Sequence, residues 1–130
     1  MNIGQAAERS GLSAKAIRYY ETAGLVSPAG RSDGGYRVYH LDDIRMLRFI
    51  RRARDLGFSI ERIRRLLDLW RDAGRASADV KHLALDHIAE IDGKIAALAA
   101  MRSAVRELAD ACDGDHRPDC PILRDLEGLT

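Results

Sequence analysis

The sequence is poor in aromatic residues and has no long apolar run. Aromatic residues make up 5% of the 130 residues, whereas charged residues make up 32%. Sandwiches and barrels depend on aromatic and β-branched residues, so this composition favours a helix-rich fold. No stretch approaches the roughly 18 apolar residues of a membrane span, and the N-terminus lacks the basic and apolar regions of a secretion signal. We therefore expect a cytoplasmic protein with no membrane partner.

Cysteine is equally scarce. The chain has two cysteines, Cys112 and Cys120, which seven residues separate. In the cytosol such residues are more often thiols or metal ligands than a structural disulfide. Two thiolates cannot complete a tetrahedral zinc site, and their spacing differs from the Cys-x2-Cys zinc pattern. Soft thiolates do suit monovalent copper, silver or gold. A reversible disulfide in a redox sensor is the alternative.

Motifs of catalysis are also missing. We find no nucleophile–base pair, no catalytic metal motif and no glycine-rich phosphate loop, so we do not expect an enzyme. Charge, by contrast, is unevenly distributed. Residues 1–70 hold 13 Lys and Arg against 8 Asp and Glu (+5), and residues 71–130 hold 8 against 12 (−4). A basic first half favours a polyanionic partner, and an acidic second half indicates a different task.

Two short helices joined by a tight turn are predicted near the N-terminus. The first covers residues 3–10 and ends at Gly11, and Ser13 is a suitable N-cap for a second over Ala14–Thr22. Such a pair is typical of a helix-turn-helix. A small β-wing over residues 30–39 should follow, because an Asp-Gly-Gly turn precedes the alternating Tyr-Arg-Val-Tyr segment. An ordinary hairpin with a solvated charge is the alternative.

Three more helices and a loop complete the predicted fold. A third helix begins near Asp42 and ends near Leu56, and one of its sides is basic through Arg45, Arg48, Arg51, Arg52 and Arg54. A fourth covers about residues 59–73, and a long helix follows. Pro121 fits the first position of a short closing helix. The predicted organisation is a winged helix-turn-helix head over residues 1–73, a hinge over 74–78, a dimerisation helix over 79–109, and a metal-binding loop with a short terminal helix over 110–130.

The long helix carries a coiled-coil seam. Its apolar residues recur in steps of three and four, as in a coiled coil. The seam consists of Ala84, Ile88, Ile91, Ile95, Leu98, Met101, Val105 and Leu108. At ~1.5 Å per residue, about 31 residues extend over roughly 46 Å, which is more than the small head can cover. We therefore expect a second copy to cover the seam in a homodimer. The predicted protein is thus mainly α-helical.

The order of these parts resembles the MerR family of transcription regulators over essentially the whole chain. Two motifs carry the resemblance, Ile17-Arg18-Tyr19-Tyr20-Glu21 and Gly35-Tyr36-Arg37-Val38-Tyr39. The resemblance implies binding to promoter DNA, where RNA polymerase also acts. The DNA-binding residues that it implies are Lys15, Arg18, Tyr19 and Tyr20 at the recognition helix, Arg31, Tyr36, Arg37 and Tyr39 from the wing, and Arg54 at a phosphate. Of Tyr19 and Tyr20, we expect one to pack inside and one to contact DNA.

The C-terminal loop is similar to that of the CueR-like copper efflux regulators within this family. This resemblance implies that Cys112 and Cys120 hold one Cu(I), Ag(I) or Au(I) ion, and His116 is a weaker candidate ligand. Related sensors of divalent ions carry a cysteine where this chain has Ser77, which would lie near the metal loop of the other subunit. The family implies activation of copper efflux or detoxification genes by distortion of promoter DNA. A thiol-redox-sensing regulator and a copper-binding buffer protein are the alternatives.

Overall fold

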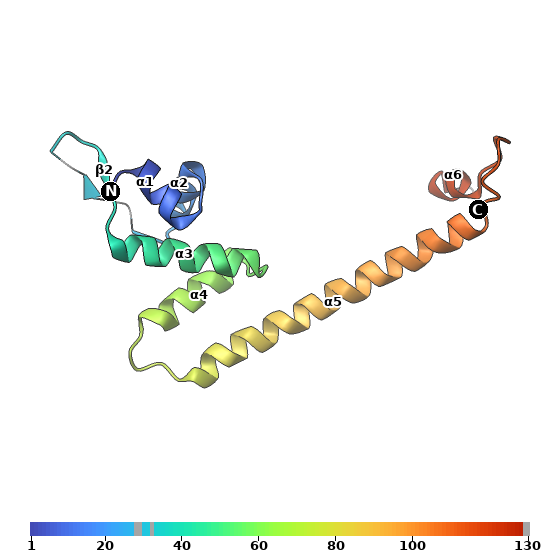
Figure 1. Cartoon of the computed structure of the whole chain (residues 1–130). Coiled ribbons are helices and arrows are strands. Elements are labelled where there is room, and N and C mark those ends of the chain that lie inside the picture. Colours follow the sequence, from blue (N-terminus) through green and yellow to red (C-terminus); the bar gives the residue numbers. More distant parts are fainter. Residues whose placement is uncertain (28–29, 32, 129–130) are drawn as a thin grey trace. The chain divides into compact units, whose positions relative to one another are not determined.

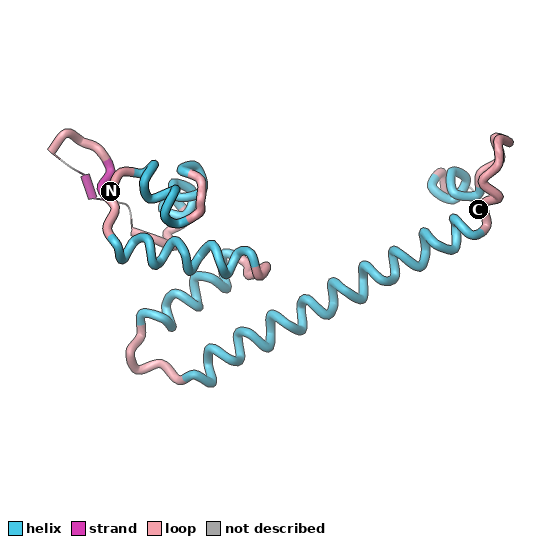
Figure 2. Tube along the Cα trace, viewed as in Figure 1, coloured by secondary structure: helices cyan, strands magenta, loops and turns pink. Residues whose placement is uncertain are grey.

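The computed structural model describes residues 1–27, 30–31 and 33–128, with the side chain of Arg31 left out. The predicted mainly helical fold is confirmed (Figures 1 and 2). The chain divides into two compact units, Met1–Leu83 and Ala84–Thr130. Within the described residues, no helix combines the length and apolar character needed to traverse a bilayer.

The predicted helix-turn-helix forms the start of the first unit. Helix α1 (Ile3–Ser10) and helix α2 (Ala14–Thr22) have the predicted bounds. Gly11 ends α1 with a φ of 77°, a left-handed conformation that glycine adopts readily. The Ser13 hydroxyl accepts a hydrogen bond from the backbone N–H of Ala16, with 3.0 Å between oxygen and nitrogen. This N-cap fixes where α2 begins.

The predicted wing is a two-stranded antiparallel hairpin. Strand β1 (Gly30–Arg31) pairs with strand β2 (Arg37–Val38), so that Gly30 lies opposite Val38. Just beyond β2, the backbone N–H of Tyr39 donates to the carbonyl of Met1, with 2.7 Å between nitrogen and oxygen. The wing is thereby tied to the residues that lead into α1.

Helices α3 (Leu41–Asp55) and α4 (Ile60–Arg71) complete the head. Helix α4 ends before the predicted residue 73. The rings of Phe49 and Trp70 stack between these helices, with centroids 4.9 Å apart and planes 10° from parallel. Such a stacked pair stabilises packing beyond the area that it buries.

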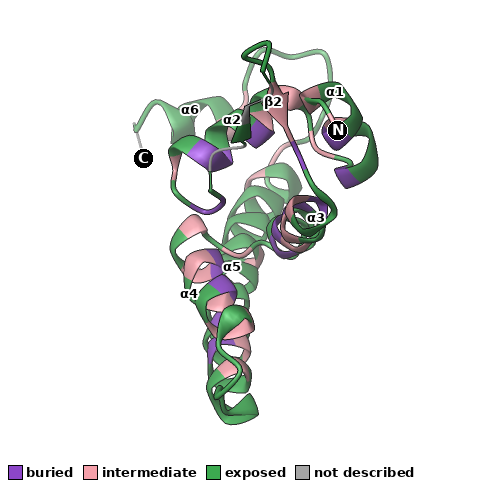
Figure 3. Ribbon diagram, turned by 90° about the vertical axis from the view of Figure 1, so that its left-hand side faces the viewer, coloured by how far each residue is buried: buried purple, intermediate pink, exposed green. Residues whose placement is uncertain are grey.

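One apolar core holds the first unit together, and Figure 3 shows it as the buried residues of its helices. Ile17 of α2, Ile50 of α3 and Ile63 of α4 are fully buried. Each such side chain contributes about 1.5–3 kcal/mol relative to exposure. The remaining buried members are Ala6, Tyr20, Leu25, Val26, Tyr39, Ile44, Leu47, Ala53 and Leu67.

The long helix α5 runs from Ser77 to Asp110, and the short helix α6 (Pro121–Leu126) follows a loop. Helix α5 thus begins inside the segment predicted as a hinge, and Asp79 in its first turn favours that start through the helix dipole. The seam residues from Ile88 to Val105 are exposed in the single chain; Ile95, for example, is 58% exposed. This apolar exposure is what the sequence predicted for a helix that needs a partner.

Candidate nucleic-acid interface and metal centre

Four exposed members of the predicted DNA-binding set lie on α2 and on the wing. Lys15 and Arg18 are exposed on α2. Tyr19, on the same helix, is 55% exposed, and Tyr36, in the wing, is 76% exposed. Arg31 lies in β1, but its side chain is outside the described residues. The exposed side chains combine cations with aromatic rings, a set suited to phosphates, base edges and sugars.

Arg54 is exposed near the end of α3. Its Nη1 donates to the carbonyl of Phe58, with 3.2 Å between nitrogen and oxygen. This bond closes the turn between α3 and α4 and leaves the other guanidinium N–H groups for a phosphate. A phosphate contact by Arg54 remains a prediction.

Tyr20 and Tyr39 lie in the core, which differs from their expected place among the DNA-binding residues. Tyr39 is 3% exposed, and Tyr20 is also buried. Of the neighbouring tyrosines, Tyr20 therefore packs inside and Tyr19 outside, because Tyr20 follows Ile17 by three positions on the buried face of α2. The two buried rings are thus part of the core of the head, and a DNA contact by either stays a prediction.

A buried carboxylate connects α2 to the wing. Glu21 accepts a hydrogen bond from the Tyr39 hydroxyl, with 2.7 Å between the oxygens, and it forms an ion pair with Arg37. Arg37 is thus engaged inside the protein and is partly buried. Glu21 was not among the residues predicted from the sequence to have a role. One signal was present, because Glu21 follows Ile17 by four positions and so lies on the same buried face.

Both partners of Glu21 have raised pKa values. The hydrogen bond with Tyr39 and the charge of Glu21 raise the pKa of Arg37. Burial, followed by the hydrogen bond to Glu21, raises the pKa of Tyr39. At neutral pH Arg37 is therefore a guanidinium cation and Tyr39 a neutral phenol.

The C-terminal end of α2 is held by an arginine of α4. Arg64 Nη2 donates to the carbonyl of Ala23 at 2.8 Å, and its Nη1 donates to the carbonyl of Gly24 at 3.3 Å. Carbonyls at a helix end have no partner within the helix, and a cation there also favours the helix dipole. Helix α2 is therefore fixed at one end by Ser13 and at the other by Arg64.

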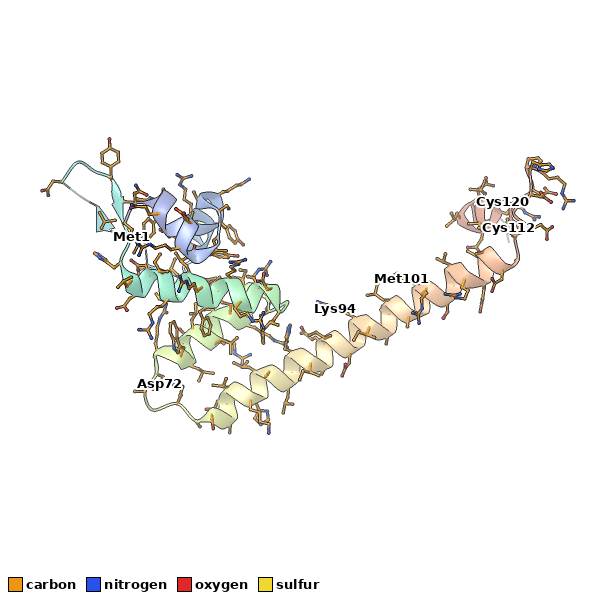
Figure 4. All side chains as sticks on the ribbon, viewed as in Figure 1. Met1, Asp72, Lys94, Met101, Cys112 and Cys120 are labelled. Carbon is orange, nitrogen blue, oxygen red and sulfur yellow. The ribbon has the colours of Figure 1, made fainter. Side chains whose placement is uncertain are left out.

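The two cysteines lie together in the second unit, where α5 ends and α6 begins (Figure 4). Both are free and partly exposed. The backbone N–H of Cys112 donates to the carbonyl of Ala109, and the carbonyl of Cys120 accepts from the backbone N–H of Arg124. Each cysteine is therefore attached to a helix, while the seven residues between them form a loop.

Charges within this loop are paired with one another. Arg117 donates to the carboxylate of Asp115 through both its backbone nitrogen and its Nε, each at 2.9 Å, and its Nη2 lies 3.2 Å from the carboxylate of Asp113. The contact with Arg117 lowers the pKa of Asp115. This local pairing reduces the effect of the acidic residues on the nearby thiols, an effect that would otherwise oppose thiolate formation.

The surroundings of Cys120 favour its charged form. The backbone amide of Leu123, followed by that of Ile122, lowers the pKa of the Cys120 thiol, and the Cys112 thiol and the charge of Arg124 act in the same direction. These amides lie in the first turn of α6, where backbone N–H groups have no partner within the helix. The thiolate is the metal-binding form of cysteine, so a soft cation fits the pair.

The donor atoms that the structure brings together in this part of the chain are the two sulfurs of Cys112 and Cys120. Among the described residues, no group of three or more His, Cys, Asp or Glu side chains is arranged to hold a metal. His116 therefore does not complete a larger set within one chain. Two thiolates without further ligands match the preference of monovalent soft ions, and they do not match the four ligands of structural zinc.

Comparisons with known proteins agree with this geometry. Residues 1–70 match the family model described as MerR HTH family regulatory protein, and residues 44–108 match the model described as MerR, DNA binding. The "Heavy metal-dependent transcription regulator 2" of Rhizobium meliloti (strain 1021) is 57% identical over 126 residues, covering 97% of this chain and 86% of that protein.

Two further similarities extend over nearly the whole chain. The HTH-type transcriptional regulator CueR of Escherichia coli O157:H7 is 45% identical over 128 residues, which cover 98% of this chain and 95% of that protein. The crystal structure of the regulator PbrR691 from Ralstonia metallidurans CH34, in complex with lead(II), has a TM-score of 0.84 and 31% identity. The match covers 97% of this chain and 98% of that one.

Proposed function

This chain belongs to the MerR family of helix-turn-helix regulatory proteins, and on that premise we propose that it is a metal-responsive transcription regulator that senses monovalent copper through Cys112 and Cys120. Members of this family bind DNA and are regulators, so the chain is not an enzyme. The observation that carries the proposal is the pair of adjacent free thiols, with surroundings that lower the pKa of Cys120.

The head would read promoter DNA through the exposed part of the predicted set. Arg18 and Lys15 on α2 supply cations for base edges and phosphates, and the rings of Tyr19 and Tyr36 suit phosphate or sugar contacts. Arg31 and Arg54 would add phosphate contacts. In this proposal Tyr20, Arg37 and Tyr39 act indirectly, because they fix the wing relative to α2 through the core and through Glu21.

A second copy of the chain would cover the exposed seam of α5. An apolar stripe along a helix of 34 residues is stable in water when another helix packs against it. Two-fold symmetry would present two heads to two half-sites about one helical turn of DNA, or a multiple of it, apart. We propose that Ser77 of the partner subunit neighbours the cysteine loop in this homodimer.

Cys112 and Cys120 would hold one monovalent ion between two thiolates, which closes the loop between α5 and α6. Pro121, Ile122 and Leu123 would then be held against the dimer helix. Bending DNA costs a few kcal/mol, so the closed loop must favour the distorted complex by a similar differential free energy. The distorted promoter would allow RNA polymerase to engage both promoter elements and to transcribe copper efflux or detoxification genes.

The choice of copper rests on the donor set and on the similarity to CueR. More similar relatives carry the broader name of heavy metal-dependent regulators, and the lead(II) complex belongs to a more distant one. Silver(I) and gold(I) share the two-coordinate thiolate chemistry of copper(I). The number and softness of the sulfur ligands favour these ions over zinc or lead.

The first test is anaerobic titration of the reduced full-length protein with copper(I) and with zinc(II), read by X-ray absorption. We expect one tightly held copper per chain with two short sulfur contacts, and weak zinc binding. Cys112→Ser and Cys120→Ser should abolish copper binding and metal-induced transcription but leave DNA binding intact. Equal or tighter zinc binding, or copper without sulfur contacts, would contradict the copper assignment.

The same variants separate the alternatives. A redox sensor would respond to oxidant and would not respond to copper(I) under reducing conditions. A copper buffer would bind the metal but would select no duplex from a random DNA library. The regulator is supported when the wild-type protein responds to copper(I) under reducing conditions and also selects a duplex. Each serine variant should then lose the metal response and keep the DNA binding.

A further inference from the structure

A basic pocket lies on the surface of the first unit, between the end of α1 and the middle and end of α3. It has a volume of about 270 Å³ and is lined by Arg9, Ser10, Arg48, Arg51, Arg52 and Asp55. Four arginines thus surround one space together with a single acidic residue. None of these six residues belongs to the predicted DNA-binding set.

Two of the arginines are held in place by the protein. Arg48 Nε donates to the carbonyl of Arg9, with 3.0 Å between nitrogen and oxygen. Arg51 Nε lies 4.0 Å from a carboxylate oxygen of Asp55. The guanidinium of Arg51 also covers Gly11, where any Cβ would overlap with it. These contacts fix one wall of the pocket.

The other two arginines have no such anchor. Arg9 and Arg52 are exposed, and within the described residues their side chains form no hydrogen bond or ion pair. The only acidic residue lining the pocket, Asp55, is engaged by Arg51. Guanidinium groups repel one another at close range, and this repulsion is relieved when an anion lies between them. A phosphate fits such a cluster because its oxygens accept paired hydrogen bonds from a guanidinium fork.

The position of the pocket identifies the source of the phosphate. Ser10, which lines the pocket, is followed by Gly11 and Leu12, and these lead directly into Ser13, the N-cap of α2. The pocket therefore adjoins the end of α2 that carries Lys15. A DNA strand whose bases contact α2 continues past this end as a row of phosphates, and most protein contacts with DNA are made to that backbone.

We infer that this pocket of Arg9, Arg48, Arg51 and Arg52 binds a backbone phosphate of the DNA next to the segment read by α2. The inference rests on the proposed DNA-binding function and extends the interface to α1 and to the basic side of α3. Contacts of this kind hold the register of the head on the duplex and are independent of base sequence.

The test uses the full-length dimeric protein and a duplex that the wild-type protein selects from a random library. Arg9→Gln, Arg52→Gln and the double variant remove exposed charges that are not anchored to the protein, so the fold should persist. Arg65→Gln removes the same charge from an exposed position on α4 and serves as the matched control. Binding constants are measured over a series of salt concentrations.

We expect the double variant to reduce the slope of log K against log salt by about 1, the value for one lost phosphate contact. Affinity should fall by the same factor for the selected duplex and for a scrambled one. A slope and affinity equal to those of Arg65→Gln would overturn the inference. So would unchanged DNA binding with reduced transcription by RNA polymerase, which would identify the pocket as a protein contact.

Failure of the proposed function gives a different result. If the wild-type protein selects no duplex, the proposed DNA-binding function is contradicted. The inference is then contradicted too, before any variant is compared. If the wild-type protein selects a duplex and Arg18→Gln weakens binding while the pocket variants do not, only the inference is wrong.

Discussion

Glu21 and Arg37 form an ion pair that joins α2 to the wing across sixteen positions of sequence. The Tyr39 hydroxyl binds the same carboxylate. The motif that ends at Glu21 and the wing motif that ends at Tyr39 are separate in the sequence but are joined in the structure. Because one carboxylate serves both partners, a single side chain of α2 holds two residues of the wing segment.

Replacing Glu21 with glutamine keeps the shape of the side chain but removes its charge. We expect Glu21→Gln to lower the free energy of unfolding by about 1–3 kcal/mol, less than for a fully buried pair because Arg37 is partly exposed. Urea denaturation measures the change. Glu8→Gln, at an exposed position of α1, should stay within about 0.5 kcal/mol of the wild type. Equal effects of the two substitutions would show that the ion pair contributes nothing.

Tyr39 should give the head a pH dependence at alkaline pH. Its pKa is raised in the folded protein, so its contribution to stability is fully present below the unfolded value of about 10 and is lost as pH rises through the folded value. We expect Tyr39→Phe to remove this alkaline loss of stability. Tyr19→Phe, at an exposed position of α2, is the control. Denaturation at a series of alkaline pH values measures both, and identical curves for the two variants would contradict the prediction.

Arg64 should stabilise the end of α2 more than an ordinary surface arginine does. Arg64→Met keeps most of the apolar stem but removes the bonds to two carbonyls, so we expect a loss of about 1–2 kcal/mol. Hydrogen exchange should accelerate at the last turn of α2. Arg65→Met, one position further along α4, should leave both quantities unchanged. If hydrogen exchange at the last turn of α2 is equally slow in both variants, other contacts hold this end of the helix.

The seam of α5 should determine the oligomeric state. Ile95→Asp places a charge in the middle of the apolar stripe, and we expect dissociation to a monomer because a buried unpaired charge costs several kcal/mol. Sedimentation at a series of protein concentrations measures the mass. Ala100→Asp adds the same charge to an exposed position outside the seam and should leave the dimer intact. A wild-type protein that is monomeric at all concentrations would overturn the dimer itself.

The sequence predicts this fold well where residues close together in the sequence determine the local structure. Ser13 and Gly11 set the bounds of the first two helices, and the three–four spacing from Ile88 onward indicates the long helix. The place of Cys112 and Cys120 at the two ends of one loop is predicted as well, because seven residues separate them; their role as metal ligands stays a prediction. In each case the residues that determine the local structure lie in one short stretch of the sequence.

The sequence does not show contacts that form only once the chain folds. Arg64 reaches Ala23 across 41 positions, and Tyr39 reaches Glu21 across 18. A tyrosine in a basic wing motif has the chemistry of a DNA contact, and nothing local to Tyr39 reveals that its hydroxyl is bound to a buried carboxylate. The sequence does not show the pocket at Arg9 for the same reason, because the pocket forms between two helices that are distant in sequence.

The stack of Phe49 on Trp70 gives the protein a built-in optical reporter. Trp70 is the only tryptophan of the chain, so its fluorescence comes from one place, the packing of α3 against α4. Far-ultraviolet circular dichroism instead reports all the helices together, those of the head as well as the 34 residues of α5. Thermal melts followed by fluorescence therefore monitor the first unit, whereas melts followed by circular dichroism monitor both units. A difference between the two midpoints would show that the second unit unfolds separately from the first.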